Sequence, residues 1–366
     1  MLKLINKLGY FPKTCVWELT LGCNLRCFHC GSRAGTPRND ELSLEEMLAV
    51  CDELADLGCE RVTLSGGEPT THPHWDTVGK RLVDNGVQVN MISNGISWDD
   101  ASAIRAKNAG FSSAAFSIDG FEESHDFIRG VAGAYKSALN AVRVCVRNNL
   151  PVSIVTTIYR KNLHELKQLG DMLASEGVVS WQLQIGNPAG NMKDHRELVI
   201  EPDDLLEIVP LLAEMRRSGQ KPRMYIGDNI GYFGPYEEDL RGTGKEIDFW
   251  LGCRAGMQVM GIESNGNIKG CLSLPSEMNR EDRFLEGNIR EKSLTDIWCN
   301  PDNFSFNRQF TVDRLGGFCR TCAYNEICRG GCLWTAFSNT GDQFDNPFCW
   351  YRVAVEKGLI EPENQS

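Results

Sequence analysis

Segments typical of β-strands and α-helices alternate along the first half of this 366-residue chain. The six predicted strands are TCVWELT at 14–20, RVTLSGG at 61–67, VQVNMIS at 87–93, SSAAFSID at 112–119, VSIVTTI at 152–158 and SWQLQIG at 180–186. Apolar residues at helical spacing predict helices between them, at 43–58, 74–85, 99–109, 134–148 and 163–176. Such alternation implies a mostly parallel sheet with right-handed crossovers.

Six strand–helix units are fewer than the eight of a complete barrel. We therefore expect an α/β fold, a partial (β/α)6 barrel of the TIM type over residues 1–200, with a doubly wound sheet as the alternative. Residues 201–250 are interpreted as a linker, with a helix at 201–217 and a loop rich in Gly and aromatic residues at 225–246. Residues 251–366 are loop-rich, contain a hairpin expected to turn at Asn265-Gly266, and would need staples or metal to be stable.

Composition excludes several classes of protein. The net charge of −11 argues against a nucleic-acid binder with a broad basic surface and gives no support to an anchor on anionic membranes. The sequence has no apolar run of transmembrane length and no signal-peptide pattern at its start, so we expect a cytoplasmic protein. Because structural disulfides are rare in that compartment, the grouped members of the 15 cysteines are expected to bind metal.

Three of these cysteines are packed into the stretch CNLRCFHC, directly after the first predicted strand. They are Cys23, Cys27 and Cys30. Loops that follow the strands of a parallel barrel build its active site. Thiolates favour zinc or iron–sulfur clusters, and a closed zinc site takes four ligands. Three thiolates on a cubane cluster would leave one iron open.

Further motifs follow the later strands in order. The loop after the second strand contains SGGEP, the third is followed by SNG and the fourth by SIDG, and RGVAGAY comes shortly afterwards. Together with CxxxCxxC, they resemble the radical S-adenosylmethionine (radical SAM) superfamily. The resemblance implies that these motifs bind the cofactor through Gly66, Gly67, Glu68, Pro69, Ser93, Asn94, Ser117, Asp119 and Arg129.

The resemblance implies a mechanism as well. A [4Fe-4S] cluster on Cys23, Cys27 and Cys30 would bind S-adenosyl-L-methionine through its open iron, with the GGEP motif at the amino group and with Ser117 and Arg129 at the ribose and carboxylate. An electron from a flavodoxin- or ferredoxin-type reductant would cleave the cofactor to methionine and a 5′-deoxyadenosyl radical. That radical would abstract hydrogen from a substrate, as in an oxidoreductase.

A second group of cysteines lies in the C-terminal third. Its order resembles the SPASM extension, which holds two auxiliary [4Fe-4S] clusters in that family. The resemblance assigns one complete cluster to Cys319, Cys322, Cys328 and Cys349, and a second to Cys253, Cys271 and Cys332. The second set lacks a fourth cysteine, so we expect either an open iron or a ligand of another type. Structural zinc is the alternative for both sets.

The substrate expected from the SPASM resemblance is a peptide side chain, which would be crosslinked or oxidised during maturation of a ribosomal peptide. Leu272 replaces the Asp of sulfatase maturases and disfavours that activity. The 22 residues before Cys23 are too few for a winged leader-binding domain, so a separate leader-binding partner or direct recognition is expected. Asp228, Tyr225 and Tyr232 are candidates for substrate contact or proton transfer.

Three alternatives remain open at this point. The first is a radical SAM enzyme of haem or small-molecule cofactor biosynthesis. The second is a non-catalytic iron–sulfur electron carrier, against which the set of cofactor motifs argues. The third is a zinc-stabilised interaction protein.

Overall fold

A curved ten-stranded sheet forms the centre of the computed structural model, which describes residues 9–219, 221–242, 249–275 and 282–363. Seven of its strands are neighbours in chain order, and each pairs with the next in parallel. They are β1 (Thr14–Glu18), β2 (Arg61–Ser65), β3 (Gln88–Ser93), β4 (Ser113–Ser117), β5 (Val152–Ile158), β6 (Ser180–Ile185) and β7 (Arg223–Ile226). A doubly wound sheet would reverse its strand order, so the partial barrel is confirmed.

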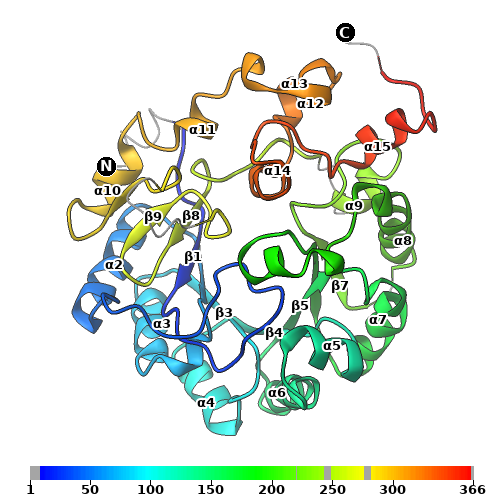
Figure 1. The fold of residues 1–366 in the computed structure, drawn as a ribbon. Helices are drawn as coiled ribbons and strands as arrows, with labels where there is room; N and C mark the ends of the chain where they lie inside the picture. Colours follow the sequence, from blue (N-terminus) through cyan, green and yellow to red (C-terminus); the bar gives the residue numbers. More distant parts are fainter. Residues whose placement is uncertain (1–8, 220, 243–248, 276–281, 364–366) are drawn as a thin grey trace.

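The crossover helices lie along the outside of this sheet (Figure 1). They are α2 (Leu44–Asp56), α3 (Trp75–Asp84), α4 (Asp100–Asn108), α6 (Ala134–Arg147), α7 (Leu166–Ser175) and α8 (Leu205–Arg217). Helix α2 begins with a capping box that Ser43 and Glu46 form. None of the described helices is long and apolar enough to cross a membrane.

Strand residues alternate between two environments. Trp17, Leu64 and Met91 belong to the set that is buried in the core that the helices cover. The alternate residues, such as Asn90 and Gln184, are only half-buried and face the concave side of the sheet. The barrel therefore has an apolar outer layer and a concave face on which polar side chains remain accessible.

Two regular elements near the barrel differ from the prediction. The predicted loop at 225–246 begins inside β7 and includes the short helix α9 (Glu237–Arg241). In addition, α5 (Glu122–Arg129) precedes α6. The sheet thus has a seventh parallel strand, which the Gly-rich sequence around it concealed.

The C-terminal region joins the same sheet. The predicted hairpin is confirmed as β8 (Val259–Ile262) and β9 (Asn267–Lys269), and β10 (Gly287–Asn288) pairs with β9. Strand β8 also pairs in parallel with β1. Short helices complete the region: α10 (Leu294–Cys299), α11 (Ser305–Arg308), α12 (Gly317–Thr321), α13 (Asn325–Cys328), α14 (Leu333–Thr340) and α15 (Trp350–Glu356). The domain limits at 200 and 250 stay a prediction.

A buried carboxylate fastens this hairpin to the barrel. Glu18, at the end of β1, is 3% exposed. Its Oε1 accepts hydrogen bonds from Arg38 Nη2 at 3.0 Å and from the backbone N–H and hydroxyl of Ser264 at 3.1 and 2.8 Å. Arg38 compensates the charge of Glu18, and the two further hydrogen bonds from Ser264 form only when the hairpin is docked.

Helix α5 is fastened to the end of β4 by a buried histidine. The Nδ1 atom of His125 accepts a hydrogen bond from the backbone N–H of Asp119 at 3.0 Å, which requires an unprotonated nitrogen. Burial, followed by the charge of Arg129, lowers the pKa of His125 from 6.5 to about 4. The imidazole is therefore neutral in the folded protein at physiological pH.

Replacing Glu18 with Gln should destabilise the protein by about 3 kcal/mol, because Arg38 would then lose the nearer of its two buried counter-charges, keeping only Glu263 at 3.9 Å. We expect faster hydrogen exchange in residues 259–269 and a lower free energy of unfolding in urea. Asp84→Asn, which breaks the exposed Lys80–Asp84 pair, should cost only about 0.5 kcal/mol. Equal losses in the two variants would contradict the role of Glu18.

Acidification should destabilise the fold through His125. Between the ordinary pKa of 6.5 and the folded value of about 4, only the unfolded chain binds the proton, so stability falls as the pH falls through this window. The full effect is about 3 kcal/mol. In His125→Asn the amide oxygen accepts the same hydrogen bond without titrating. Its thermal midpoint should therefore fall less than that of the wild type on acidification, whereas parallel curves would refute this cause.

Candidate active site

The loop after β1 folds back on itself around the three cysteines. The backbone N–H of Cys23 donates to the carbonyl of Gly35 at 3.0 Å. The backbone N–H groups of Leu25 and Ala34 point at the sulfur atoms of Cys23 and Cys30, at 3.4 and 3.3 Å. Hydrogen bonds to sulfur stabilise thiolates and tune iron–sulfur clusters, so the loop has the donors that such a group needs.

The GGEP loop packs directly against this cysteine loop. The backbone N–H of Gly67 donates to the carbonyl of Thr20, and that of Glu68 to the carbonyl of Gly22, both at 2.8 Å. A Cβ atom on Gly67 would overlap Gly22, and one on Gly66, where φ is +137°, would overlap Thr20. The two glycines are thus required for contact between two backbones, whether or not a ligand also approaches.

The side chain of Glu68 serves this loop network. Its buried carboxylate accepts hydrogen bonds from the hydroxyls of Thr70 and Ser93, at 2.6 and 2.8 Å, and from the backbone N–H of Asn94 at 2.7 Å. The amide of Asn94 then donates to Asn24 in the cysteine loop at 2.7 Å. Three of the predicted cofactor residues, Glu68, Ser93 and Asn94, are therefore joined by hydrogen bonds. A fourth, Pro69, is buried at the start of the 3-10 helix Pro69–Thr71.

Asp119 and Arg129 form a buried ion pair beside the cysteines. The Nη2 and Nε atoms of Arg129 lie 2.7 and 2.8 Å from Oδ2 of Asp119, and its Nη1 lies 3.9 Å from Sγ of Cys27. His29 approaches the same carboxylate at 3.4 Å. Burial alone would raise the pKa of Asp119, but Arg129 and the neighbouring histidines outweigh it and lower the pKa. The pair thus places a fixed positive charge at a cysteine thiolate.

Asn191 is a contact of the cysteine loop that sequence reasoning missed. Its side-chain amide donates to the carbonyl of Cys27 and its backbone N–H to the carbonyl of Cys30, both at 2.9 Å. On another side of the cysteine loop, the backbone N–H of Phe28 donates to the carbonyl of Ile128 at 2.9 Å. A single Asn in the short 3-10 helix Gly190–Asp194 carries no pattern that would have singled it out.

Ser117 differs from the other predicted cofactor residues because its side chain remains half-exposed, at the carboxyl end of β4 on the concave face. Tyr225, on β7, is 45% exposed, with the guanidinium of Arg223 5.0 Å from its ring centre. Both residues are accessible to a ligand bound against the concave face.

Four C-terminal cysteines meet around one cavity. Its lining includes Cys319, Cys322, Cys328 and Cys349, together with Gly330, Gly331 and the rings of Tyr232, Phe233, Tyr324 and Tyr351. Burial, together with nearby thiols, raises the pKa of Cys319 to about 11 and that of Cys349 to about 12. Thiols in such surroundings lose their protons readily only to a metal, so the donor set fits the predicted complete cluster.

The other three cysteines are also brought together. The thiol of Cys253 interacts electrostatically with Cys332 and Cys271. Cys332 stands at the start of α14, and its backbone N–H donates to the hydroxyl of Tyr232 at 2.9 Å. Tyr232, a predicted site residue, is fully buried. Its ring lines the cavity of the four cysteines and its hydroxyl contacts Cys332, so it lies between the two groups of thiols.

The thiols are not arranged around a single ion. In the described ranges, no group of three or more His, Cys, Asp or Glu side chains is placed to hold one metal ion. A cubane cluster presents its irons at separate corners and accepts more widely spaced thiolates. The structure therefore gives the zinc alternative no tetrahedral site within those ranges.

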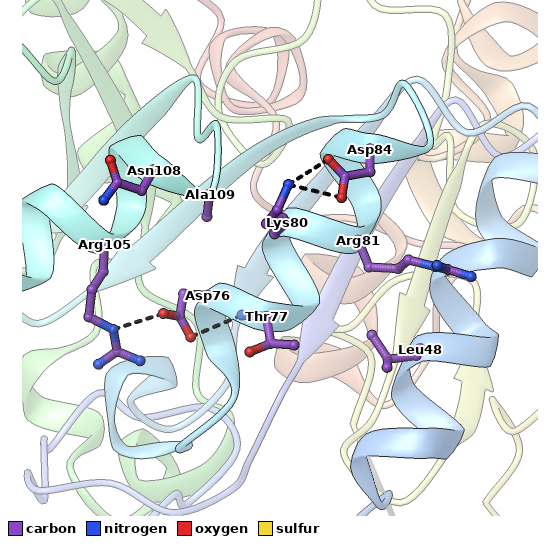
Figure 2. Close-up of a pocket in the computed structure, with 9 residues that line it drawn as sticks. All are labelled: Leu48, Asp76, Thr77, Lys80, Arg81, Asp84, Arg105, Asn108 and Ala109. Atoms are coloured by element: carbon purple, nitrogen blue, oxygen red, sulfur yellow. Dashed lines mark hydrogen bonds and ion pairs between the residues drawn. The ribbon is translucent and has the colours of Figure 1, made fainter.

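A depression on the outer helices is separate from these groups. It lies between α2, α3 and α4 and has no cysteine in its lining (Figure 2). Its cations already have partners: Lys80 pairs with Asp84 and Arg105 with Asp76, as drawn, and Arg81 pairs with Asp52. We assign it no role in the chemistry.

Comparisons with known proteins agree with this geometry. Residues 17–173 match the model of the radical SAM superfamily, and residues 253–323 match that of an iron–sulfur cluster-binding domain, SPASM. The chain is 30% identical to an AdoMet-dependent heme synthase of Methanosarcina barkeri, over 93% of this chain and 97% of that protein.

A second relative and one solved structure are also similar to this chain. The sporulation killing factor maturation protein SkfB of Bacillus subtilis is 29% identical over 79% of this chain and 65% of its own length. The crystal structure of Streptococcus suis SuiB bound to S-adenosylmethionine superposes with a TM-score of 0.73 at 16% identity, over 93% of this chain and 78% of SuiB, which shows a shared fold.

The motifs that follow the strands, the two groups of C-terminal thiols and the near full-length match to one relative lead to the same family. The chain belongs to the radical SAM superfamily and carries a SPASM iron–sulfur domain.

Proposed function

We propose that this radical SAM enzyme acts on a haem precursor, the small-molecule alternative named above. The observation that supports this choice is the match in both identity and length to the AdoMet-dependent heme synthase, which extends over 97% of that relative. The match covers 93% of this chain and therefore extends through the barrel into the C-terminal region. Those are the parts from which a substrate site would be built.

A peptide side chain is the second candidate. Identity to SkfB is similar, at 29%, but the match covers only 65% of that protein. The likeness to SuiB is one of fold. A peptide substrate and a separate leader-binding partner, both expected from the SPASM resemblance, are therefore supported less well than a haem precursor.

The chain's own residues would hold the cofactors as follows. Cys23, Cys27 and Cys30 would bind the cluster, and the backbone N–H groups aimed at their sulfurs would stabilise it. Arg129, fixed by Asp119, would keep a positive charge beside Cys27 and within reach of an anionic cofactor group. When bound, S-adenosylmethionine and the cluster supply the radical that abstracts hydrogen.

The concave face would position the substrate. Its half-exposed side chains are uncharged at Asn90, Ser117 and Gln184, so they can orient a bound molecule by hydrogen bonds. Near the edge strand β7, Tyr225 offers an aromatic face with Arg223 over it. A flat, carboxylate-bearing ring would find a stacking surface and a cation in that pair.

Anaerobic reconstitution should load about twelve irons per chain if all three clusters are cubanes. With dithionite, the protein should release 5′-deoxyadenosine from S-adenosylmethionine. Cys27→Ala should lose about four irons and all of this release, because the first cluster would lack a ligand. Cys145→Ala, which alters a buried cysteine of the helical core, is the control and should keep both. Zinc with little iron, or unchanged release from Cys27→Ala, would contradict the assignment.

The substrate class is tested by supplying an iron porphyrin with carboxylate side chains to the reduced enzyme. We expect it to stimulate 5′-deoxyadenosine formation and to lose one hydrogen atom for each 5′-deoxyadenosine formed. Deuterium at the reacting position should appear in 5′-deoxyadenosine. No stimulation by porphyrins, combined with deuterium transfer from a peptide encoded beside this chain, would replace the proposal with the second candidate.

A further inference from the structure

The group formed by Cys253, Cys271 and Cys332 has one sulfur fewer than a cubane has irons. Among the described residues, the loop after β7 supplies a carboxylate in the neighbourhood of this group. Asp228 lies in this loop, and its negative charge acts on the thiols of both Cys271 and Cys332. A carboxylate beside two thiolates is repelled by them unless a cation lies between.

The position of Asp228 is fixed by hydrogen bonds on both sides. The backbone N–H of Gly227 donates to Leu183 at 2.7 Å. The amide of Asn229 donates to the carbonyl of Ile185 at 2.8 Å and accepts from its backbone N–H at 3.2 Å. The loop is therefore held to β6 immediately before and after Asp228.

Tyr232 links this loop to the cysteine group. Its hydroxyl donates to the carbonyl of Asp228 at 2.6 Å and accepts from the backbone N–H of Cys332 at 2.9 Å. One oxygen atom thus joins the backbones of Asp228 and Cys332. The backbone of Tyr232 has φ of +81°, which a residue with a Cβ rarely adopts, so the surrounding structure enforces this bridge.

The carboxylate itself is not used for protein contacts. In the part of the chain that the structure describes, the side chain of Asp228 makes no hydrogen bond or ion pair, and it is exposed. The other acids close to this hairpin are occupied: Glu263 and Asp282 lie 3.2 and 2.7 Å from the buried ammonium of Lys269. Asp228 is therefore the carboxylate that remains available to the thiol group.

We propose that Asp228 is the fourth ligand of the iron–sulfur cluster held by Cys253, Cys271 and Cys332. The ligand comes from the barrel, through the loop after β7, while the three thiolates come from the C-terminal region. This assignment goes beyond the proposed function and holds for either substrate class, because it concerns the resting cluster.

The test uses 13C-cyanide, which binds an open iron, and electron–nuclear spectroscopy of the reduced, fully loaded enzyme. The wild type should show 13C coupling only from the cluster at Cys23, Cys27 and Cys30, which every variant shares. Asp228→Ala should gain a second 13C coupling at unchanged iron content. Glu238→Ala, which removes an exposed carboxylate farther along the same segment, should match the wild type.

Asp228→Cys covers the case in which the alanine variant loses its cluster. A thiolate there should keep the iron closed to cyanide and shift the paramagnetic spectrum of the cluster relative to wild type. A second 13C coupling already present in the wild type would overturn the proposal, since the iron would be open. Absence of the second coupling in a fully loaded Asp228→Ala, or an unshifted spectrum in Asp228→Cys, would overturn it too.

Discussion

The buried carboxylate of Asp119 holds together parts of the site that come from different strands. Its Oδ1 accepts the backbone N–H of Thr157 on β5 at 2.9 Å, and its Oδ2 binds Arg129 on α5. His29, from the cysteine loop, contacts the same oxygen. Removing a carboxylate from water costs several kcal/mol, and only matched donors and a nearby cation offset this. The cysteine loop is therefore positioned by a charge that is tolerated only in the assembled barrel.

Much of the fold follows from local sequence patterns. The six predicted strands end within one or two residues of the observed ones, because each is a buried run bounded by turn residues. Strand β7 has four residues and leads into Gly227, so its local pattern is that of a loop, and only pairing with β6 makes it a strand. The pairing of β8 with β1 joins distant segments, which no local pattern reports.

The site was predictable where residue type and spacing carry chemistry, as in the grouped cysteines and the glycines after β2. It was not predictable where a side chain acts through a long-range contact. Asn191 binds the cysteine loop from a short 3-10 helix, and Asn24 within that loop accepts from Asn94, yet a single Asn carries no pattern that reports such a contact. The contact of Glu68 with the cofactor stays a prediction, and the hydrogen bonds of its carboxylate to Thr70, Ser93 and Asn94 carry no local sequence signal. Sequence identifies such residues more readily than it identifies their partners.

The parallel pairing of β8 with β1 bears on electron exchange within the molecule. Strand β1 leads into the cysteine loop and β9 leads into Cys271, so both thiol groups follow strands of one sheet, with β8 paired between the two. The C-terminal region cannot swing on a hinge without breaking that ladder. Electron tunnelling weakens steeply with distance. A shared sheet therefore keeps the path between two redox centres at constant length, even when loops around a bound substrate move.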